Sequence, residues 1–394
     1  MLDFSNTEIA FSAKSNNDLR LAQMLFAAIG SNSLVKFMKG ATELALSIKF
    51  PVGWAVKPTL YRHFVGGERL EDCTKTTDIL AKSKVMSILD YSAEAGEAES
   101  DIEHAYNEIM HSIEYTATNP YVEFAVFKPT AMTTEHILGK ANAKGDFTRE
   151  EQVKYDEYRK RIYNLCKRAY ELNVKILIDA EDFCFQDDID LVCEEMMREF
   201  NKERAIVFNT LQMYRHDRLE YLKRVFDDAV EGDYYLGIKF VRGAYMEKER
   251  ERAIEGGYPS PICDTKELTD INYNDGLRFT IENIDRIDTF CGTHNEESNK
   301  LLASMMAEKG IAKDDKRIWF AQLYGMSDNI SYNLAHDGYN ITKYIPYAPV
   351  DRVLPYLIRR AEENTSMAGQ TSRELGYINT EIKRRENIKG TSKI

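Results

Sequence analysis

Polar and charged side chains end the short apolar runs of this chain. These side chains are Asp90, Lys128, Asp179, Gln212, Arg242, His294, Gln322 and Tyr344. Lysine and arginine bind anions, aspartate orients cations, and the others add hydrogen-bonding groups. No serine, cysteine or histidine pairing that would activate a nucleophile accompanies them. The set therefore indicates a site that binds and orients a small charged ligand.

Two adjacent arginines follow the last of these runs. On a helix Arg359 and Arg360 point about 100° apart, and Glu363 lies four and three residues beyond them, within reach of either. Two guanidinium groups can clamp a carboxylate or phosphate. A solvated arginine pair beside a surface glutamate is the alternative. Together with Lys128, the arginines outnumber Asp179 and Glu363, which favours an anionic substrate.

The acidic segment from Asp179 to Asp182 allows three interpretations: a metal site, a general base, or a cap at a helix N-terminus. A metal site needs more converging carboxylates or histidines. The histidines are dispersed, and among them His294 ends an apolar run. We therefore expect no catalytic metal.

The segment Arg242-Gly-Ala-Tyr245 combines a cation with two small residues. Gly243 and Ala244 would let a phosphate or a flavin ring approach the backbone closely, although a simple left-handed turn gives the same pattern. The chain contains no GxGxxG, GxxxxGK[ST] or GxSxG sequence. Rossmann, P-loop and nucleophile-elbow chemistries thus lack their signatures.

Eight apolar, β-branched runs must position these groups, and a charged amphipathic stretch follows each run. The runs span residues 85–91, 122–128, 174–179, 204–212, 235–242, 289–294, 318–324 and 341–347. Buried strands that alternate with helices predict a parallel sheet, and eight such units favour a closed (βα)8 barrel with its site at the carboxyl ends of the strands. An open doubly wound sheet is the alternative.

Helical segments are expected on both sides of the barrel. We predict a helical arm over residues 1–83, the barrel over 84–368 and a C-terminal helix over 369–394. The arm shows helical spacing at Leu19, Ala22, Leu25, Phe26 and Ile29. The C-terminal helix carries an apolar stripe of Leu375, Ile378 and Ile382.

The composition limits the partners of this 394-residue chain. Its net charge of −12 disfavours nucleic acid, whose phosphates require a basic surface. No apolar run approaches the roughly 18 residues of a membrane-spanning helix. The six cysteines are scattered without a CxxC pair, which indicates reduced thiols in the cytoplasm.

Five segments in register resemble the proline dehydrogenase family, closest to its eukaryotic-like single-function branch. They are Phe240–Tyr245, Gly292–Asn295, Gln322–Asp328, Lys343–Pro349 and Leu354–Asn364, and the likeness runs from Gly66 to Glu381. The resemblance implies a distorted (βα)8 barrel whose last helix lies over the barrel mouth. It also implies FAD as cofactor, oxidation of L-proline to Δ1-pyrroline-5-carboxylate, and transfer of electrons to a quinone at a membrane.

The same resemblance implies roles for individual residues. Arg359, Arg360 and Lys128 would hold the proline carboxylate, and Asp179 would orient these cations. Tyr245, Leu323 and Tyr344 would pack the pyrrolidine ring against the flavin. The FAD would be lined by Gln212, Lys239, Arg242, Gly243, Ala244, Thr293, His294, Asn295, Glu363 and Ser366. Many bacterial members carry arginine where Lys239 stands, a departure that concerns the tuning of the flavin.

Three other functions stay open at this point. A hydroxyproline dehydrogenase would have the same fold, but such members carry a small serine at the position of Tyr344. A Schiff-base aldolase would use Lys128 as nucleophile. A carboxylate- or quinone-binding scaffold would show no turnover. We expect a cytoplasmic protein, with peripheral contact at the inner face of a membrane as a further option.

Overall fold

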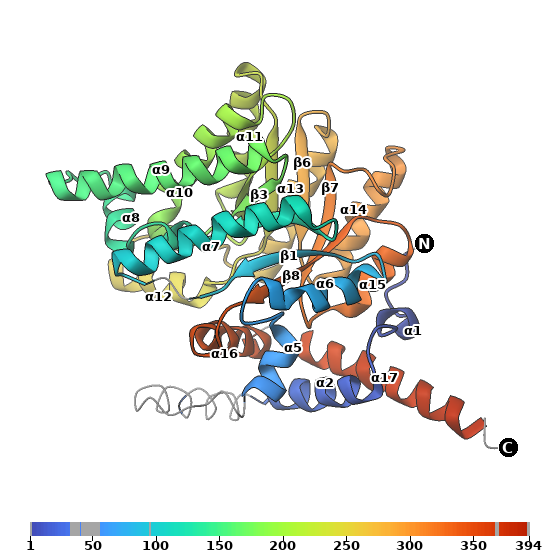
Figure 1. The fold of residues 1–394 in the computed structure, drawn as a ribbon. Coiled ribbons are helices and arrows are strands. Elements are labelled where there is room, and N and C mark those ends of the chain that lie inside the picture. The colour runs from blue at the N-terminus through green and yellow to red at the C-terminus, as the bar shows by residue number, and fades with distance from the viewer. Residues whose placement is uncertain (1, 32–39, 41–55, 94–95, 367–369, 392–394) are drawn as a thin grey trace. The chain divides into compact units, whose positions relative to one another are not determined.

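The structure is a computed structural model that describes residues 2–31, 40, 56–93, 96–366 and 370–391 (Figure 1). Its strands are β1 (Met86–Tyr91), β2 (Val122–Phe127), β3 (Lys175–Ile178), β4 (Val207–Gln212), β5 (Leu236–Val241), β6 (Ile287–Gly292), β7 (Ile318–Leu323) and β8 (Ile341–Tyr347). They follow one another in chain order around a closed barrel. The predicted (βα)8 barrel is therefore confirmed, and the open sheet is excluded.

Helices connect successive strands. The principal helices of the barrel are α7 (Glu99–Thr118), α8 (Glu135–Asn142), α9 (Arg149–Glu171), α10 (Phe183–Phe200), α11 (Arg218–Glu231), α12 (Met246–Gly256), α13 (Lys266–Glu282), α14 (Glu296–Glu308), α15 (Asp328–His336) and α16 (Val350–Ser366). A 3-10 turn, η3 (Pro129–Ala131), follows β2. Helix α9 begins at a capping box, in which Thr148 and Glu151 satisfy each other's backbone N–H groups.

Helices flank the strands from β2 to β6 on the side away from the barrel interior (Figure 1). Helix α7 packs on β2, α9 on β3, α10 on β4, and α13 on both β5 and β6. The adjacent strands are parallel, with Phe124 opposite Lys175 and Thr210 opposite Lys239. Parallel strands place their carboxyl ends at one rim, so the residues that follow them meet there.

Aromatic side chains fill the barrel interior between β2 and β7. The ring of Phe124 makes edge contacts with Phe208, Phe290 and Trp319 at centroid distances of 5.7, 5.2 and 5.4 Å. Lys175 Nζ donates to Asp288 Oδ2 at 2.9 Å beside this cluster. Because strand side chains alternate between faces, Lys128 and Gln212, which lie four positions after Phe124 and Phe208, are directed to the same side of the strands at the carboxyl rim.

Tyr344 and His294 do not end their strands. Strand β8 spans the predicted run, Ile341–Tyr347, so Tyr344 lies within it, and residues 66 and 67 pair beside its end. Gly66 N–H donates to Pro346 O at 2.9 Å, and Ala348 N–H donates to Gly67 O at 3.2 Å. Strand β6 ends at Gly292, so His294 belongs to the following loop.

The chain divides into two compact units, one of residues 1–87, 92–94 and 322–394, and one of residues 88–91 and 95–321. The first unit contains α1 (Thr7–Ala10), α2 (Asn16–Ile29), η1 (Lys57–Tyr61), α5 (Arg62–Phe64), η2 (Glu71–Cys73), α6 (Thr74–Ala81) and α17 (Gln370–Thr391). Helices α2 and α17 lie side by side (Figure 1). Residues 32–39 and 41–55 of the expected arm lie outside the described residues.

The buried faces of α2 and α17 depart from the predicted stripes. In α2, Leu19, Ala22, Phe26 and Ile29 are buried as expected, whereas Leu25 is half-exposed. In α17 the buried residues include Thr371, Glu374, Ile378 and Glu381, while Leu375 and Ile382 stay half-exposed. The glutamates are buried because they accept hydrogen bonds, Glu374 from Ser327 and Glu381 from two arginines of its own helix. Among the described helices, none is long and apolar enough to cross a membrane.

Candidate active site

Strands β2 to β5 present their polar residues at one rim of the second unit. Lys128 directly follows β2, Asp179 directly follows β3, Gln212 ends β4, and Lys239 lies near the end of β5. Gln212 and Lys239 are buried, with exposures of 4% and 5%. The structure thus brings together four of the residues that the sequence placed in the site.

Lys128 forms an ion pair that the sequence analysis did not assign. Its Nζ lies 3.1 and 3.2 Å from the two carboxylate oxygens of Asp90. Burial lowers the pKa of Lys128, but Asp90 and Asp179 outweigh it and raise this pKa above the ordinary value. The lysine side chain stays 30% exposed, against 3% for Asp90. The ammonium group of Lys128 is therefore charged and held in place by Asp90, and the exposed part of its side chain can contact a ligand.

Lys239 pairs with Asp179 across the rim. Its Nζ lies 2.5 Å from Asp179 Oδ1, and the two side chains are 7% and 15% exposed. Such a pair, removed from water, is strong only when both partners stay in place. The carboxylate expected to orient the substrate-binding cations is thus bonded to a residue expected to face the flavin.

Glu181 is a buried carboxyl group that sequence reasoning did not single out. Its two oxygens accept from the backbone N–H of Thr130 at 2.9 Å and from the Thr130 hydroxyl at 2.6 Å. Burial raises the pKa of Glu181 to about 7, although both hydrogen bonds and Lys128 oppose the shift. Because Thr130 stands two residues after Lys128, Glu181 anchors the turn that carries the lysine.

The acidic segment after β3 does not behave as a simple helix cap. Asp182 occupies the N-cap position of α10 without a capping hydrogen bond from its side chain. Instead it pairs with Lys248 at 2.5 Å and Arg252 at 3.0 Å, both in α12. The backbone N–H of Phe183 donates to the buried Glu249 at 2.9 Å. These bonds attach the segment to α12.

Arg242 is held by three side chains around its guanidinium group. Its Nε lies 2.7 Å from Asp270, its Nη1 lies 2.6 Å from the Thr293 hydroxyl, and its Nη2 lies 3.0 Å from the Ser298 hydroxyl. The guanidinium also stacks on Tyr273, 4.4 Å from the ring centroid. The side chain is 17% exposed. This positive group is therefore fixed in direction at the end of β5.

Position 243 requires glycine because of contacts within the protein itself. Its φ of +123° lies where side chains are strained, and an added Cβ would come within 2.5 Å of the Tyr214 ring. Ala244 is exposed, and the half-buried Tyr245 precedes α12 with Lys248 Nζ 5.6 Å from its ring centroid. The turn thus leaves a small alanine and an aromatic face at the rim.

The segment after β6 combines a cap with polar groups. Asn295 Oδ1 accepts from the backbone N–H groups of Glu297 and Ser298 at 2.9 and 3.1 Å, which caps α14. Thr293 bridges Arg242 to the N–H of Asn295. His294 is half-buried beside them. Part of the polar character of this motif is therefore structural.

The remaining candidates belong to the first unit. Leu323 ends β7 half-buried, and Tyr344 is buried within β8 at 9% exposure. Arg359, Arg360, Glu363 and Ser366 lie in α16, as the helical spacing predicted, and their side chains fall outside the described part of the structure. In the second unit Lys128, Lys239 and Arg242 each pair with a carboxylate.

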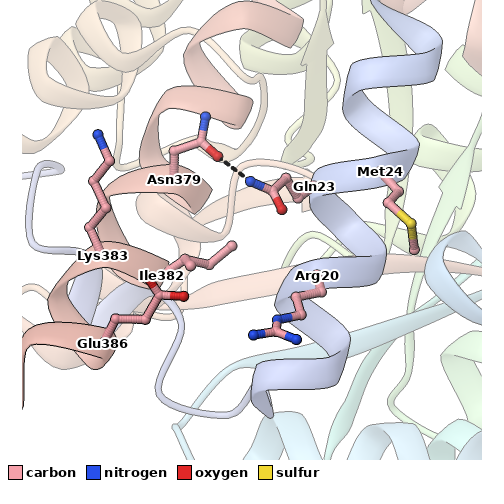
Figure 2. A pocket seen from close by; sticks show the side chains of 7 residues that line it. All are labelled: Arg20, Gln23, Met24, Asn379, Ile382, Lys383 and Glu386. Atoms are coloured by element: carbon pink, nitrogen blue, oxygen red, sulfur yellow. Dashed lines mark hydrogen bonds between the residues drawn. The ribbon is translucent and has the colours of Figure 1, made fainter. Parts of the chain in front are cut away.

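Other features of the described residues carry no catalytic set. No three or more His, Cys, Asp or Glu residues among them are placed to hold a metal ion. All six cysteines are described and free. A surface groove of 610 Å³ runs between α2 and α17, lined by Arg20, Gln23, Met24, Asn379, Ile382, Lys383 and Glu386 (Figure 2). It contains none of the candidate residues.

Comparison with known proteins gives matches over most of the chain. The model of the family described as proline dehydrogenase matches residues 73–373. The carbapenem antibiotics biosynthesis protein CarD of Pectobacterium carotovorum is 33% identical over 82% of this chain and 83% of its own length. Proline dehydrogenase 2, mitochondrial, of Arabidopsis thaliana is 33% identical over 84% of this chain and 78% of its own length.

Solved structures give the same fold. Proline utilization A from Bdellovibrio bacteriovorus superimposes with a TM-score of 0.71 at 22% identity, over 93% of this chain. The chain spans 37% of that larger protein. At this identity the likeness supports the barrel architecture.

Proposed function

The chain belongs to the proline dehydrogenase family of oxidoreductases, which act in proline catabolism, and we propose that it uses FAD as hydride acceptor and passes the electrons to a quinone. The reaction oxidises L-proline to Δ1-pyrroline-5-carboxylate. The observation that carries the site assignment is the group of buried, paired ions at the carboxyl rim of β2 to β5, where a barrel enzyme builds its active site.

The donor set at this rim suits FAD. A flavin ring offers nitrogen and oxygen acceptors, and its diphosphate is anionic, so the cofactor needs cationic and amide donors. Lys239, Arg242 and Gln212 supply these donors, and Thr293 and Asn295 add shorter polar groups. Arg242 is already fixed in direction by its three partners. We propose that Gly243, Ala244 and His294, with Glu363 and Ser366 of α16, complete the lining.

Lys128 is proposed to hold the substrate carboxylate together with Arg359 and Arg360. Asp90 keeps Lys128 charged, and Glu181 holds the turn that carries it, so the ammonium is oriented before substrate binds. Asp179, bonded to Lys239, links this anion-binding group to the group that faces the cofactor. Tyr245, Leu323 and Tyr344 would pack the pyrrolidine ring.

Bound FAD would supply the hydride acceptor for this oxidation. The chain's own residues orient the ring and exclude water, and none needs to form a covalent bond. The ring nitrogen must be neutral for the hydride to leave. Cations at the carboxylate favour this neutral amine by opposing the positive charge of its protonated form.

A Schiff-base aldolase is disfavoured by the state of Lys128. Its nucleophile would need a depressed pKa, whereas the carboxylates around Lys128 raise its pKa. A hydroxyproline dehydrogenase is disfavoured because this chain carries Tyr344 where such enzymes carry a small serine.

We propose cytoplasmic residence with peripheral contact at the inner face of a membrane, where the quinone would be met. We also propose a functional division into the arm of residues 1–83, the catalytic barrel of 84–368 and the helix of 369–394.

The reaction itself can be tested by its product. Purified protein with L-proline and an artificial electron-accepting dye should yield a cyclic imine two hydrogens lighter than proline, detected by mass spectrometry, with equimolar dye reduction. Dye reduction without this product, or no reduction with any imino acid, would refute the proposed reaction.

A further inference from the structure

The loop between β7 and α15, residues 324–327, has an unusual backbone. Gly325 has a φ of +80° and Ser327 a φ of +49°. A side chain at Gly325 would meet the carbonyl oxygen of His63 at 2.5 Å. Serine is uncommon in the left-handed region, so neighbouring groups must hold the loop in this shape.

A buried lysine holds this loop from β8. Lys343 is fully buried, and its Nζ lies 2.9 Å from Asp328 Oδ1. The same ammonium donates to the carbonyl oxygens of Leu323, at 3.4 Å, and Met326. Its three N–H donors are therefore all directed at the loop and its two ends.

The N-terminal arm supplies a second cation to the same carboxylate. Lys14 Nζ lies 3.0 Å from Asp328 Oδ2, and the two side chains are 20% and 7% exposed. Burial raises the pKa of Asp328, but the two lysines outweigh it and hold this pKa well below its usual range. Asp328 thus joins Lys14 to Lys343 in one chain of buried charges.

Two further residues grip the loop backbone. Glu374 of α17 accepts from Ser327, at 2.6 Å from the backbone N–H and 3.0 Å from the hydroxyl. His63 Nε2 lies 2.9 Å from Gly325 O, and burial lowers the pKa of His63 to about 3, so the neutral ring donates this bond. Lys14 and α5 of the arm and Glu374 of α17 therefore all contact the loop or its end.

The residues that this assembly holds adjoin two proposed substrate contacts. Leu323 immediately precedes the loop, and Tyr344 immediately follows Lys343. The N–H of Tyr324 donates to Tyr344 O at 2.9 Å. Because successive strand residues point to opposite faces, Lys343 faces the ion cluster while Tyr344 faces the other side of β8.

We propose that Lys14 is a positioning residue for the substrate: through Asp328 and Lys343, the N-terminal arm sets the places of Leu323 and Tyr344 and so shapes the pocket for the imino acid ring. This rests on the proposed function, which gives Leu323 and Tyr344 their role. Because Leu323 and Tyr344 are proposed to pack the imino acid ring, displacing them should weaken substrate binding and leave the chemical step largely unchanged.

The ion pair between Lys14 and Asp328 can be removed without detaching the arm. Arg385 of α17 holds the arm by its backbone, with bonds of 2.8 Å to the carbonyl oxygens of Phe11 and Lys14. Lys14→Met therefore leaves the arm attached, and Asp328 keeps Lys343 as partner. A matched control is Gln23→Met, which removes another contact between arm and C-terminal helix, the 2.7 Å bond from Gln23 to Asn379 (Figure 2).

The test compares full-length wild type, Lys14→Met, Lys14→Arg and Gln23→Met. Lys14→Met should raise KM for proline about 10-fold and change the preference for proline over trans-4-hydroxy-L-proline, with flavin content and kcat within about 2-fold of wild type. Lys14→Arg should restore both values. Gln23→Met should lower Tm alone.

Several outcomes would overturn the proposal. Lys14→Met that lowers Tm while KM and the substrate preference stay at wild-type values would make Lys14 purely structural, as would an equal KM change in Gln23→Met. If Lys14→Met does not fold, Lys14→Gln, which keeps a donor for Asp328, replaces it under the same criteria. A wild type that does not oxidise proline would instead refute the proposed function.

Discussion

Lys239 Nζ lies 2.5 Å from Asp179 Oδ1, which joins the inner face of β5 to the end of β3. Both side chains are largely buried, so neither has water to replace its partner. The residue proposed to face the flavin and the residue proposed to orient the substrate clamp are thus a single electrostatic unit.

We therefore expect Asp179→Asn to impair both ligands. It leaves a buried ammonium without its carboxylate, a change that costs about 3–5 kcal/mol. Flavin content should fall and KM for proline should rise. Asp288→Asn is the matched control, because Asp288 forms the Lys175 pair beside the aromatic cluster. The control should lose stability and keep its KM, and a similar KM change in both variants would contradict the assignment.

Arg359→Met and Arg360→Met should mainly weaken proline binding. Removing one partner of a desolvated charge contact costs about 2–5 kcal/mol, or roughly 30-fold to several thousand-fold in affinity. Flavin content should stay at the wild-type level, because the two arginines are proposed to bind the substrate carboxylate and not the flavin. Arg352→Met, an exposed arginine of the same helix, provides the control. An unchanged KM for proline in either clamp variant would show that the arginines bind something else.

Tyr344→Ser should narrow the preference for proline. Tyr344 is proposed to fill the space beside the far carbon of the ring, where crowding by a hydroxyl would cost about 1–3 kcal/mol. The wild type should therefore favour proline over trans-4-hydroxy-L-proline by roughly one to two decades in kcat/KM. The serine variant should lose proline packing and gain room for the hydroxyl. Steady-state kinetics with both substrates test this prediction. A serine variant that prefers proline over trans-4-hydroxy-L-proline more strongly than the wild type would show that Tyr344 does not determine this preference.

Glu181 should make stability fall as pH rises. Its pKa is about 7 in the folded protein against the ordinary 4.5, so the folded state holds an extra proton between these values. The stabilisation is complete below pH 4.5 and lost as pH rises through about 7, which amounts to about 3 kcal/mol. In urea unfolding across this range, the wild type should lose about 3 kcal/mol of stability relative to Glu181→Gln, which has no titrating group at this position. Parallel pH curves would mean that the group is not titrating here.

The barrel could be predicted from sequence because its strands are continuous apolar runs bounded by charged helices. The cations at the rim could be placed because parallel strands end together. The sequence pattern could not predict which charged side chains form ion pairs. Asp90 and Lys128 are 38 positions apart in the sequence and come into contact only in the folded barrel. Local residue spacing therefore does not predict this ion pair.

Buried acids were missed for a related reason. Glutamate side chains usually lie at the protein surface, so the sequence gives no sign that Glu181, Glu249 and Glu374 are buried. Their burial depends on hydrogen-bond donors from segments that are distant in the sequence. Glu374 and Glu381 therefore lie on the buried face of α17. Of the expected apolar stripe of Leu375, Ile378 and Ile382, Ile378 is buried and the other two are half-exposed. For Gly243 the motif was recognised, but its requirement comes from the Tyr214 ring.

Arg242 should be needed to retain the cofactor, because its fixed guanidinium is the best-oriented cation of the proposed FAD lining. Arg242→Met should lower the flavin content of the purified protein at least several-fold, whereas Arg224→Met, on the exposed face of α11, should leave it unchanged. Flavin released by denaturation and measured per mole of protein provides the number. Full flavin content in Arg242→Met would remove this residue from the cofactor site.

The most direct test of the account is the visible absorption spectrum of the purified protein under anaerobic conditions, recorded before and after addition of L-proline. We expect a bound flavin whose oxidised absorption is bleached by L-proline and unchanged by NADH. A protein without flavin after purification and reconstitution with FAD, or a flavin bleached by NADH and not by proline, would contradict it.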